Sequence, residues 1–354
     1  MRAISFSEVT TALKCFAQWD FSYGDQLAGC SLKRRETATI LSDGRAWGAG
    51  VATWHATGDK WQSAGALTAS LHGDYEAMIG RGLSPSPEQL TDQYADLLPM
   101  LVHYEQTAAR LDDFGQAERE IVVPLPRLID GQGRSSRYRY QCFLDGFCSY
   151  SGHPAIAEFK LRESLTDVDV IERQPQYRWY AWAYAREIDW DGPVSVIVDE
   201  RLKAWPHEAR IVKARSKKEG IDGRVPSRSP DQFTTAELYV AACVEYGVTP
   251  SAEAAERLDA RRWQQRVVLT FTPFELAEVG RELATAGHLV SELDRGKLYP
   301  VRNGSAMNCR RCRFSDVCSE PTNDFLVNSM FEKRPAKRDR ADSERSESKP
   351  QETT

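Results

Sequence analysis

The sequence predicts an α/β protein: a central mixed sheet flanked by helices, a helical N-terminal region, and a cysteine-rich knot near the C-terminus. Three observations lead to this prediction. Apolar residues at helical spacing dominate the first 118 residues, strand-like runs dominate residues 119–215, and three closely spaced cysteines follow later helical segments. Of the 354 residues, 41% are hydrophobic and 27% are charged, which is ordinary for a globular domain.

The N-terminal region is expected to be mainly helical. Ser5 or Ser7 can cap the first helix, and a proline-rich break at 83–87 divides the last segment. The helical segments cover residues 5–23, about 43–57, and 61–110.

The middle of the chain has a different texture, with apolar and aromatic residues in short runs. The turn Ser151-Gly-His-Pro joins two of these runs, so we expect a hairpin. One helix is expected over 171–187. The expected strands are 121–125, 138–148, 155–161, 194–198 and, more weakly, 209–213.

The rest of the chain is expected to complete a single domain over residues 1–330. Residues 220–230 are rich in Gly, Ser and Pro and predict a loop, and a strand at 266–271 lies between helices at 235–246 and 273–293. Residues 331–354 have mixed charge and few apolar residues, which predicts a disordered tail. The domain is expected to have three parts: 1–118, 119–215 and 216–330.

Charge and cysteine content restrict the classes of protein. The net charge of −5 leaves room for nucleic acid as a partner, because a local basic groove suffices. No stretch resembles a signal peptide or a membrane span, so a cytoplasmic location is expected. The eight cysteines then need an explanation other than disulfides.

The hairpin carries a candidate metal site. Glu158 and Lys160 are two residues apart on one expected strand, so they share a face, and Asp145 on the partner strand can approach them. Two converging carboxylates suit Mg²⁺ or Mn²⁺, and a lysine beside them can orient the attacking water. A surface salt bridge is the alternative, but an apolar run precedes Glu158, which favours a site.

Three further residues are weaker candidates. Gln176 and Tyr180 share one face of the next helix and could orient the lysine or a phosphate. If they stood alone, the preferred interpretation would be a solvent-facing glutamine and a core tyrosine. His55, following Trp54, would alone be interpreted as a structural histidine.

Cys309-x₂-Cys312-x₅-Cys318 lies in a polar, arginine-rich segment that cannot bury three thiols in a core. The spacing suits a metal centre that needs a fourth ligand. Spacing alone decides neither between zinc and iron–sulfur nor which cysteine is the fourth ligand. The candidates are Cys15, Cys30, Cys142, Cys148 and Cys243.

Taken in order, these residues resemble the PD-(D/E)XK nucleases of the RecB-like branch. They are most similar to its iron–sulfur members: CRISPR-associated four-cysteine exonucleases, AddB-type nuclease domains and phage-encoded exonucleases. In that group one cysteine lies in an N-terminal helix and three close the domain as C-x₂-C-x₅-C. These correspond to Cys15, Cys309, Cys312 and Cys318.

The resemblance implies a restriction-endonuclease-like core and a Mg²⁺- or Mn²⁺-dependent DNA exonuclease with a [4Fe–4S] cluster held by these four cysteines. The metal ligands would be His55, Asp145, Glu158 and the Phe159 carbonyl. Lys160 would position the water, supported by Gln176 and Tyr180. The substrate would be single-stranded DNA or duplex ends. A role in phage recombination, replication or repair is implied, in the host cytoplasm and with a single-strand annealing protein as partner.

Two alternatives remain open. One is a Cys₄ zinc protein of the same fold, and the other is a catalytically inactive DNA-binding protein that keeps the cluster. The sequence has no G-x₄-G-K-[ST] motif, so no ATP motor is expected. Basic residues could follow the DNA backbone or form a solvated face: Arg162, Lys213, Lys217 and Lys218.

Overall fold

The computed structural model describes residues 2–34, 39–80, 82, 84–115, 118–127, 134–214, 216, 219–305, 309–310 and 312–337. Within these ranges no helix combines the length and the apolar character needed to cross a membrane.

Two sheets form the centre of the molecule, and the chain passes from one to the other at Asp145. The first has the order β1-β4-β3, and the second has the order β10-β7-β6-β5. Strands β6 and β7 are parallel, while β5 and β10 pair antiparallel at the two edges, so the predicted mixed sheet is confirmed. The strands are β1 Arg2–Ser5, β3 Arg119–Pro126, β4 Arg134–Leu144, β5 Gly146–Tyr150, β6 His153–Arg162, β7 Val194–Leu202 and β10 Gln264–Phe271.

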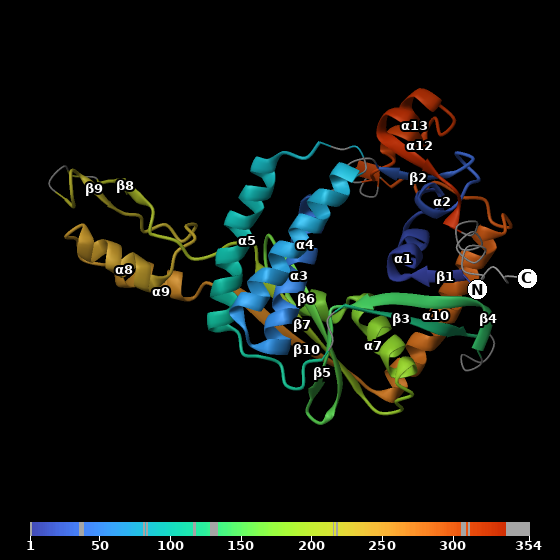
Figure 1. Ribbon diagram of the computed structural model, residues 1–354, viewed down its shortest axis with the longest axis horizontal. Helices are drawn as coiled ribbons and strands as arrows, with labels where there is room; N and C mark the ends of the chain where they lie inside the picture. The colour runs from blue at the N-terminus through green and yellow to red at the C-terminus, as the bar shows by residue number, and fades with distance from the viewer. Residues whose placement is uncertain are drawn as a thin grey trace, which may run out of the picture.

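Helices cover both faces of the second sheet (Figure 1). Along β6, Ile156 belongs to the core under α7 and α10, whereas Ala157 and Phe159 belong to the core under α3, α4 and α5. This alternation is the period of two expected of a strand buried on both sides. The helices are α3 Thr39–Thr57, α4 Lys60–Gly80, α5 Pro87–Thr107, α7 Pro175–Glu187 and α10 Pro273–Asp294.

The two ends of the described chain meet in a small module of their own (Figure 1). Its core contains Phe21, Phe314 and Phe331, and the last two rings stack with centroids 5.4 Å apart. Strands β2 and β11 pair antiparallel across it. Helix α1 Phe6–Lys14 precedes the module and buries Val9 and Ala12 in the main core. The elements of the module are α2 Phe16–Tyr23, β2 Ser31–Arg34, α12 Ser315–Cys318, α13 Asp324–Met330 and β11 Phe331–Arg334.

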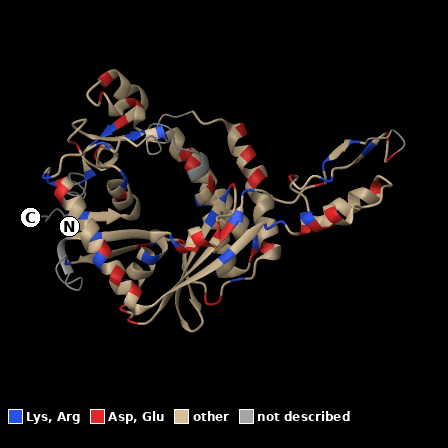
Figure 2. Cartoon of the chain, turned by 180° about the vertical axis from the view of Figure 1, so that it is seen from behind, with Lys and Arg blue, Asp and Glu red and all other residues tan. Residues whose placement is uncertain are grey.

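An arm projects from the body between β7 and β10 (Figure 1). It consists of a two-stranded hairpin followed by two helices, with a separate core around Tyr239 and Leu258. Figure 2 shows basic residues on the hairpin and acidic residues on the helices. The elements of the arm are β8 Ile211–Lys213, β9 Arg224–Pro226, α8 Ala236–Glu245 and α9 Ala252–Asp259.

Three expected elements are interrupted in the structure. The first helix breaks at Cys15, whose backbone is extended with φ −163° and ψ 117°. The expected helix at 171–187 is divided into α6 Val168–Glu172 and α7, because Pro175 begins α7 and disfavours helical backbone at the residue before it. The expected strand at 138–148 is divided between the two sheets, so Asp145 lies between strands and not within one.

Other differences concern short elements. The loop at 220–230 contains β9, and α9, β1 and β2 form where no element was expected. The charged tail was expected from residue 331, yet Phe331 is buried in β11 by the ring of Phe314. Residues 338–354 of that tail lie outside the described residues.

Candidate active site

The site forms where β5 ends and β6 continues. Gly146, the first residue of β5, pairs with Ala157, so the next residues of β6 have no partner strand on that side. Asp145 takes that place, and its Oδ2 accepts the Phe159 N–H at 2.8 Å. In an extended strand, the N–H and C=O of one residue point to the same side, so the Phe159 carbonyl also faces Asp145.

Glu158 and Lys160 share the β6 face that lies toward α7, as their spacing predicts. Lys160 Nζ forms an ion pair with Glu158 Oε1. From α7, Gln176 Nε2 lies 3.4 Å from the same oxygen and donates to the Tyr180 hydroxyl at 2.9 Å. The structure therefore brings together five of the expected residues: Asp145, Glu158, Lys160, Gln176 and Tyr180.

One oxygen of Glu158 has no partner. The Glu158 side chain is 3% exposed, and its Oε2 is buried without a hydrogen bond in the described structure. A buried, unpaired carboxylate oxygen is costly, so it fits a site for a cation. Among the residues described, no three His, Cys, Asp or Glu side chains form a metal-binding group. Mg²⁺ does not need three such side chains, since it usually binds one or two carboxylates and keeps several waters.

Electrostatics within the site favour cation binding. Burial, with the charge of Asp145, raises the pKa of Glu158 to about 7, although Lys160 opposes the rise. Burial also raises the pKa of Asp145, again against Lys160. Burial disfavours the charged form of Lys160, but Glu158 and Asp145 outweigh this and raise its pKa above the usual value. A divalent cation would relieve the repulsion between the two carboxylates.

A cavity of about 490 Å³ lies between α3 and the end of β6, and Asp145, Phe159 and Lys160 line it. Apart from Arg45, its α3 wall is built of small residues, including Gly48, Ala49 and Ala52, so space remains over Asp145 and Lys160. Glu118 also lines the cavity, and its charge contributes to the raised pKa of Asp145. Sequence reasoning missed Glu118 because no local pattern marks it; only the folding of β3 beside Asp145 brings it there.

His55 is not brought to the carboxylates. Its Nε2 pairs with the Tyr104 hydroxyl at 2.9 Å, and its Nδ1 accepts the Leu111 N–H at 3.1 Å. The ring stacks on Phe159, whose side chain lies on the opposite β6 face from Glu158. Both ring nitrogens are therefore engaged, and burial lowers the pKa of His55 to about 3.

Arg162, proposed to follow the DNA backbone, is paired inside the structure. Its Nε donates to Glu200 Oε1 at 3.0 Å, and Glu200 also accepts the Thr166 N–H. This arrangement gives Arg162 a structural role at the end of β6. Lys217 and Lys218 lie outside the described residues.

The four expected cluster cysteines lie near one another, and two of them contact Asn303. Cys15 Sγ accepts the Asn303 N–H at 3.3 Å, and Cys309 Sγ donates to the Asn303 carbonyl at 3.5 Å. Burial raises the pKa of Cys312, and the thiols of Cys15, Cys318 and Cys309 add to the rise. The break between α1 and α2 places Cys15 toward this group.

The cysteines do not form a coordination group for a single ion in the part of the chain that the structure describes. The alternative fourth ligands Cys142, Cys148 and Cys243 are buried elsewhere, as expected of core thiols. Cys30 packs on the same core as Cys15, near Lys333 and Arg334.

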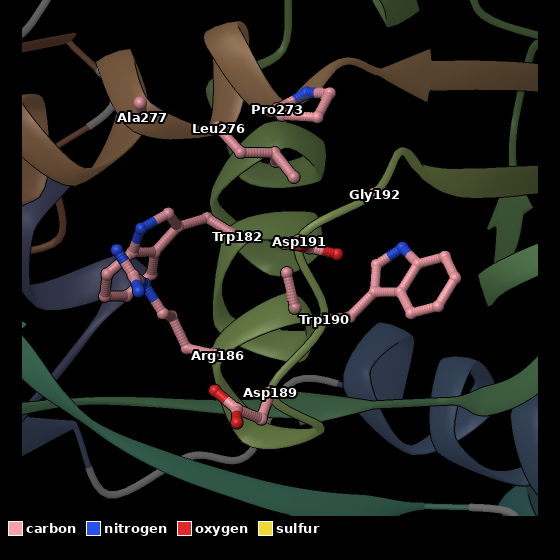
Figure 3. Close-up of a pocket in the computed structure, with 10 residues that line it drawn as sticks. Trp182, Arg186, Asp189, Trp190, Asp191, Gly192, Pro273, Leu276 and Ala277 are labelled. Atoms are coloured by element: carbon pink, nitrogen blue, oxygen red, sulfur yellow. The ribbon is translucent and has the colours of Figure 1, made fainter.

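A second cavity, of about 260 Å³, lies between the end of α7 and the start of α10 (Figure 3). Trp182, Arg186 and Trp190 line it, but Asp145, Glu158 and Lys160 do not. Of the catalytic candidates, Asp145 and Lys160 line the first cavity, and none of the three lines the second.

Asp145 thus lies beside the Glu158-x-Lys160 segment where β5 stops pairing with β6. A model of the PD-(D/E)XK nuclease superfamily matches residues 3–319, and the chain belongs to this superfamily. Membership implies a nuclease, a hydrolase that acts on DNA and that in this superfamily typically uses Mg²⁺ or Mn²⁺. No curated protein matches the chain significantly.

Proposed function

We propose that this protein is a Mg²⁺- or Mn²⁺-dependent DNA exonuclease of the RecB-like branch. The observation that carries the proposal is the meeting of Asp145, Glu158 and Lys160 where β5 no longer pairs with β6. There a buried Glu158 oxygen has no partner in the described structure. The family match over residues 3–319 supports the nuclease class.

Asp145, Glu158 and the Phe159 carbonyl would hold the metal. When bound, the metal polarises the phosphate and lowers the pKa of the attacking water. Lys160 stays protonated and can hold the water or a phosphate oxygen by hydrogen bonds while neutralising developing charge. Gln176 fixes Glu158 and Tyr180 relative to each other, which keeps the carboxylate oriented. No step is assigned to His55.

Action at DNA ends, and a phage recombination role with an annealing partner, rest on the order and spacing of the motifs. The test is Mg²⁺-dependent cleavage of end-labelled linear DNA, single- and double-stranded, beside a closed circle. Loss of linear DNA with the circle intact is expected. Cleavage of the circle would show endonuclease activity and contradict the proposed exonuclease activity. Binding without cleavage of any substrate would instead favour the inactive DNA-binding protein.

We also propose that Cys15, Cys309, Cys312 and Cys318 bind a [4Fe–4S] cluster. Support comes from the mutual proximity of the four thiols and from the polar segment that carries three of them. Protein purified without oxygen should contain iron and sulfide and absorb visible light, and Cys312→Ala should lose both features. Stoichiometric zinc in colourless protein would contradict the cluster and favour the Cys₄ zinc alternative.

A further inference from the structure

The arm begins and ends beside the candidate active site. The Lys203 N–H donates to the carbonyl of Arg162 at 2.6 Å, two residues past Lys160 on β6. The Leu202 N–H donates to the carbonyl of Trp263, the last residue before β10, at 2.9 Å. Both stems of the arm are thus fixed to the end of the sheet that carries the catalytic candidates.

The hairpin of the arm is strongly basic in an acidic protein. Residues 210–228 contain seven Lys and Arg against two Asp and Glu, while the whole chain has a net charge of −5. The described cations of this segment are exposed: Arg210, Lys213, Arg224 and Arg228. The acidic residues of α8 and α9 lie on another part of the arm (Figure 2).

The pairing of the hairpin places like charges opposite each other. Lys213 and Arg224 are direct partners in the register of β8 and β9. Like charges opposite across two strands destabilise a sheet, and an isolated two-stranded hairpin is marginal already. Within the described residues neither cation forms an ion pair with a carboxylate, so internal pairing does not account for them.

We propose that the hairpin face bearing Lys213 and Arg224 binds the phosphodiester backbone of DNA outside the catalytic cavity. A polyanion relieves the repulsion between the two cations and releases condensed counterions when it binds. The arm lies at the active-site end of the sheet, so one DNA strand could contact both the hairpin and the active site. The proposal rests on the proposed function in taking DNA as the ligand.

The test is the salt dependence of DNA binding, measured by fluorescence anisotropy in EDTA so that no cleavage occurs. The probe is a duplex of about 40 base pairs. Lys213→Gln/Arg224→Gln should lower the slope of log affinity against log salt by about two, because each phosphate contact contributes about 0.9. The matched control is Arg257→Gln/Arg281→Gln, which removes two exposed cations outside the hairpin, one on α9 of the arm and one on α10, and should keep the slope.

Two further measurements separate the possible outcomes. The hairpin variant should melt no lower than wild type, because it removes a repulsion; a lower melting temperature would indicate a structural role and contradict the proposal. An unchanged salt slope would also overturn it. In Mg²⁺ the hairpin variant should have a higher KM for DNA than wild type and the same kcat. If wild-type protein binds DNA but never cleaves it, the proposed nuclease activity is refuted. The salt slope of DNA binding still tests the hairpin inference in that case.

Discussion

At the scale of single residues, Glu158 combines burial, an ion pair and an oxygen without a partner among the described residues. Lys160 neutralises one oxygen, and Gln176 approaches the same atom, so the other oxygen is left for a cation. The cost of that buried oxygen is of the kind that functional sites retain.

The raised pKa of Glu158 predicts a pH-dependent metal affinity. Because its value is about 7, a proton competes with the metal below that pH, and the affinity for Mn²⁺ should fall about tenfold per pH unit. Calorimetric titration from about pH 5 to about 8 measures this. Lys160→Met should shift the pH dependence of Mn²⁺ affinity to higher pH, since Lys160 lowers the pKa of Glu158. A flat affinity over this range would contradict the assignment.

The lowered pKa of His55 predicts that the stability of the protein depends on pH. Its folded pKa of about 3 lies below the ordinary 6.5, so the unfolded chain binds more protons between these values. The stabilisation is present above about pH 6.5 and is lost at about 1.4 kcal/mol per pH unit on acidification. The difference in free energy of unfolding between wild type and His55→Asn should become smaller as pH falls, as measured by chemical denaturation. His55→Asn should also leave Mn²⁺ affinity unchanged; a large loss of affinity would restore His55 as a ligand.

At the scale of elements, α3 supplies one wall of the cavity that Asp145 and Lys160 line. Its Gly48 would place an added Cβ in open space, with no atom within 4 Å. The helix therefore keeps a glycine at a position where alanine fits. Glycine in mid-helix costs about 0.5–1 kcal/mol relative to alanine, which suggests that the space has a use.

Two substitutions at Gly48 test the cavity. Gly48→Ala should raise the free energy of unfolding by about 0.5–1 kcal/mol in chemical denaturation. Gly48→Phe should fill the cavity and raise the KM for DNA, with the fold intact by circular dichroism. Equal KM values for wild type and Gly48→Phe would show that the substrate does not enter here.

Much of the fold could be predicted from periodicity. The apolar runs of β6 and β7 and the proline-rich break between α4 and α5 lie where the sequence places them. Glu158 and Lys160 share a face because strand geometry requires it. The break at Asp145 could not be predicted, because residues 138–148 read as one aromatic strand and only pairing with different partners divides it. Glu118 depends on tertiary structure alone.

At the scale of the whole molecule, α2 near the N-terminus and the C-terminal elements α12, α13 and β11 form one module. Phe331 is fully buried, next to Phe314 and on the same core as Cys15 and Cys312. The packing of the two ends thus supports the proposed cluster, and the cluster would in turn hold the ends together.

Phe331→Ala should lower the free energy of unfolding by about 3–5 kcal/mol, because it removes a large side chain from a closed core. It should also reduce the iron content of protein purified without oxygen, since the cysteines lie against that core. Phe325→Ala is the matched control: this ring is 81% exposed on neighbouring α13 and should change neither quantity. Equal stability of both variants would contradict the role of this module.

The central claim is that the carboxylate of Glu158 is required for metal-dependent cleavage of DNA. The direct measurement is the Mg²⁺-dependent cleavage rate of end-labelled linear DNA by Glu158→Gln, beside the control Glu163→Gln, whose side chain is 79% exposed at the end of the same strand. Glu158→Gln should lose more than about 100-fold in rate, since loss of a supporting partner alone costs 10–100-fold, and Glu163→Gln should match wild type. Cleavage by Glu158→Gln close to the wild-type rate would contradict the account.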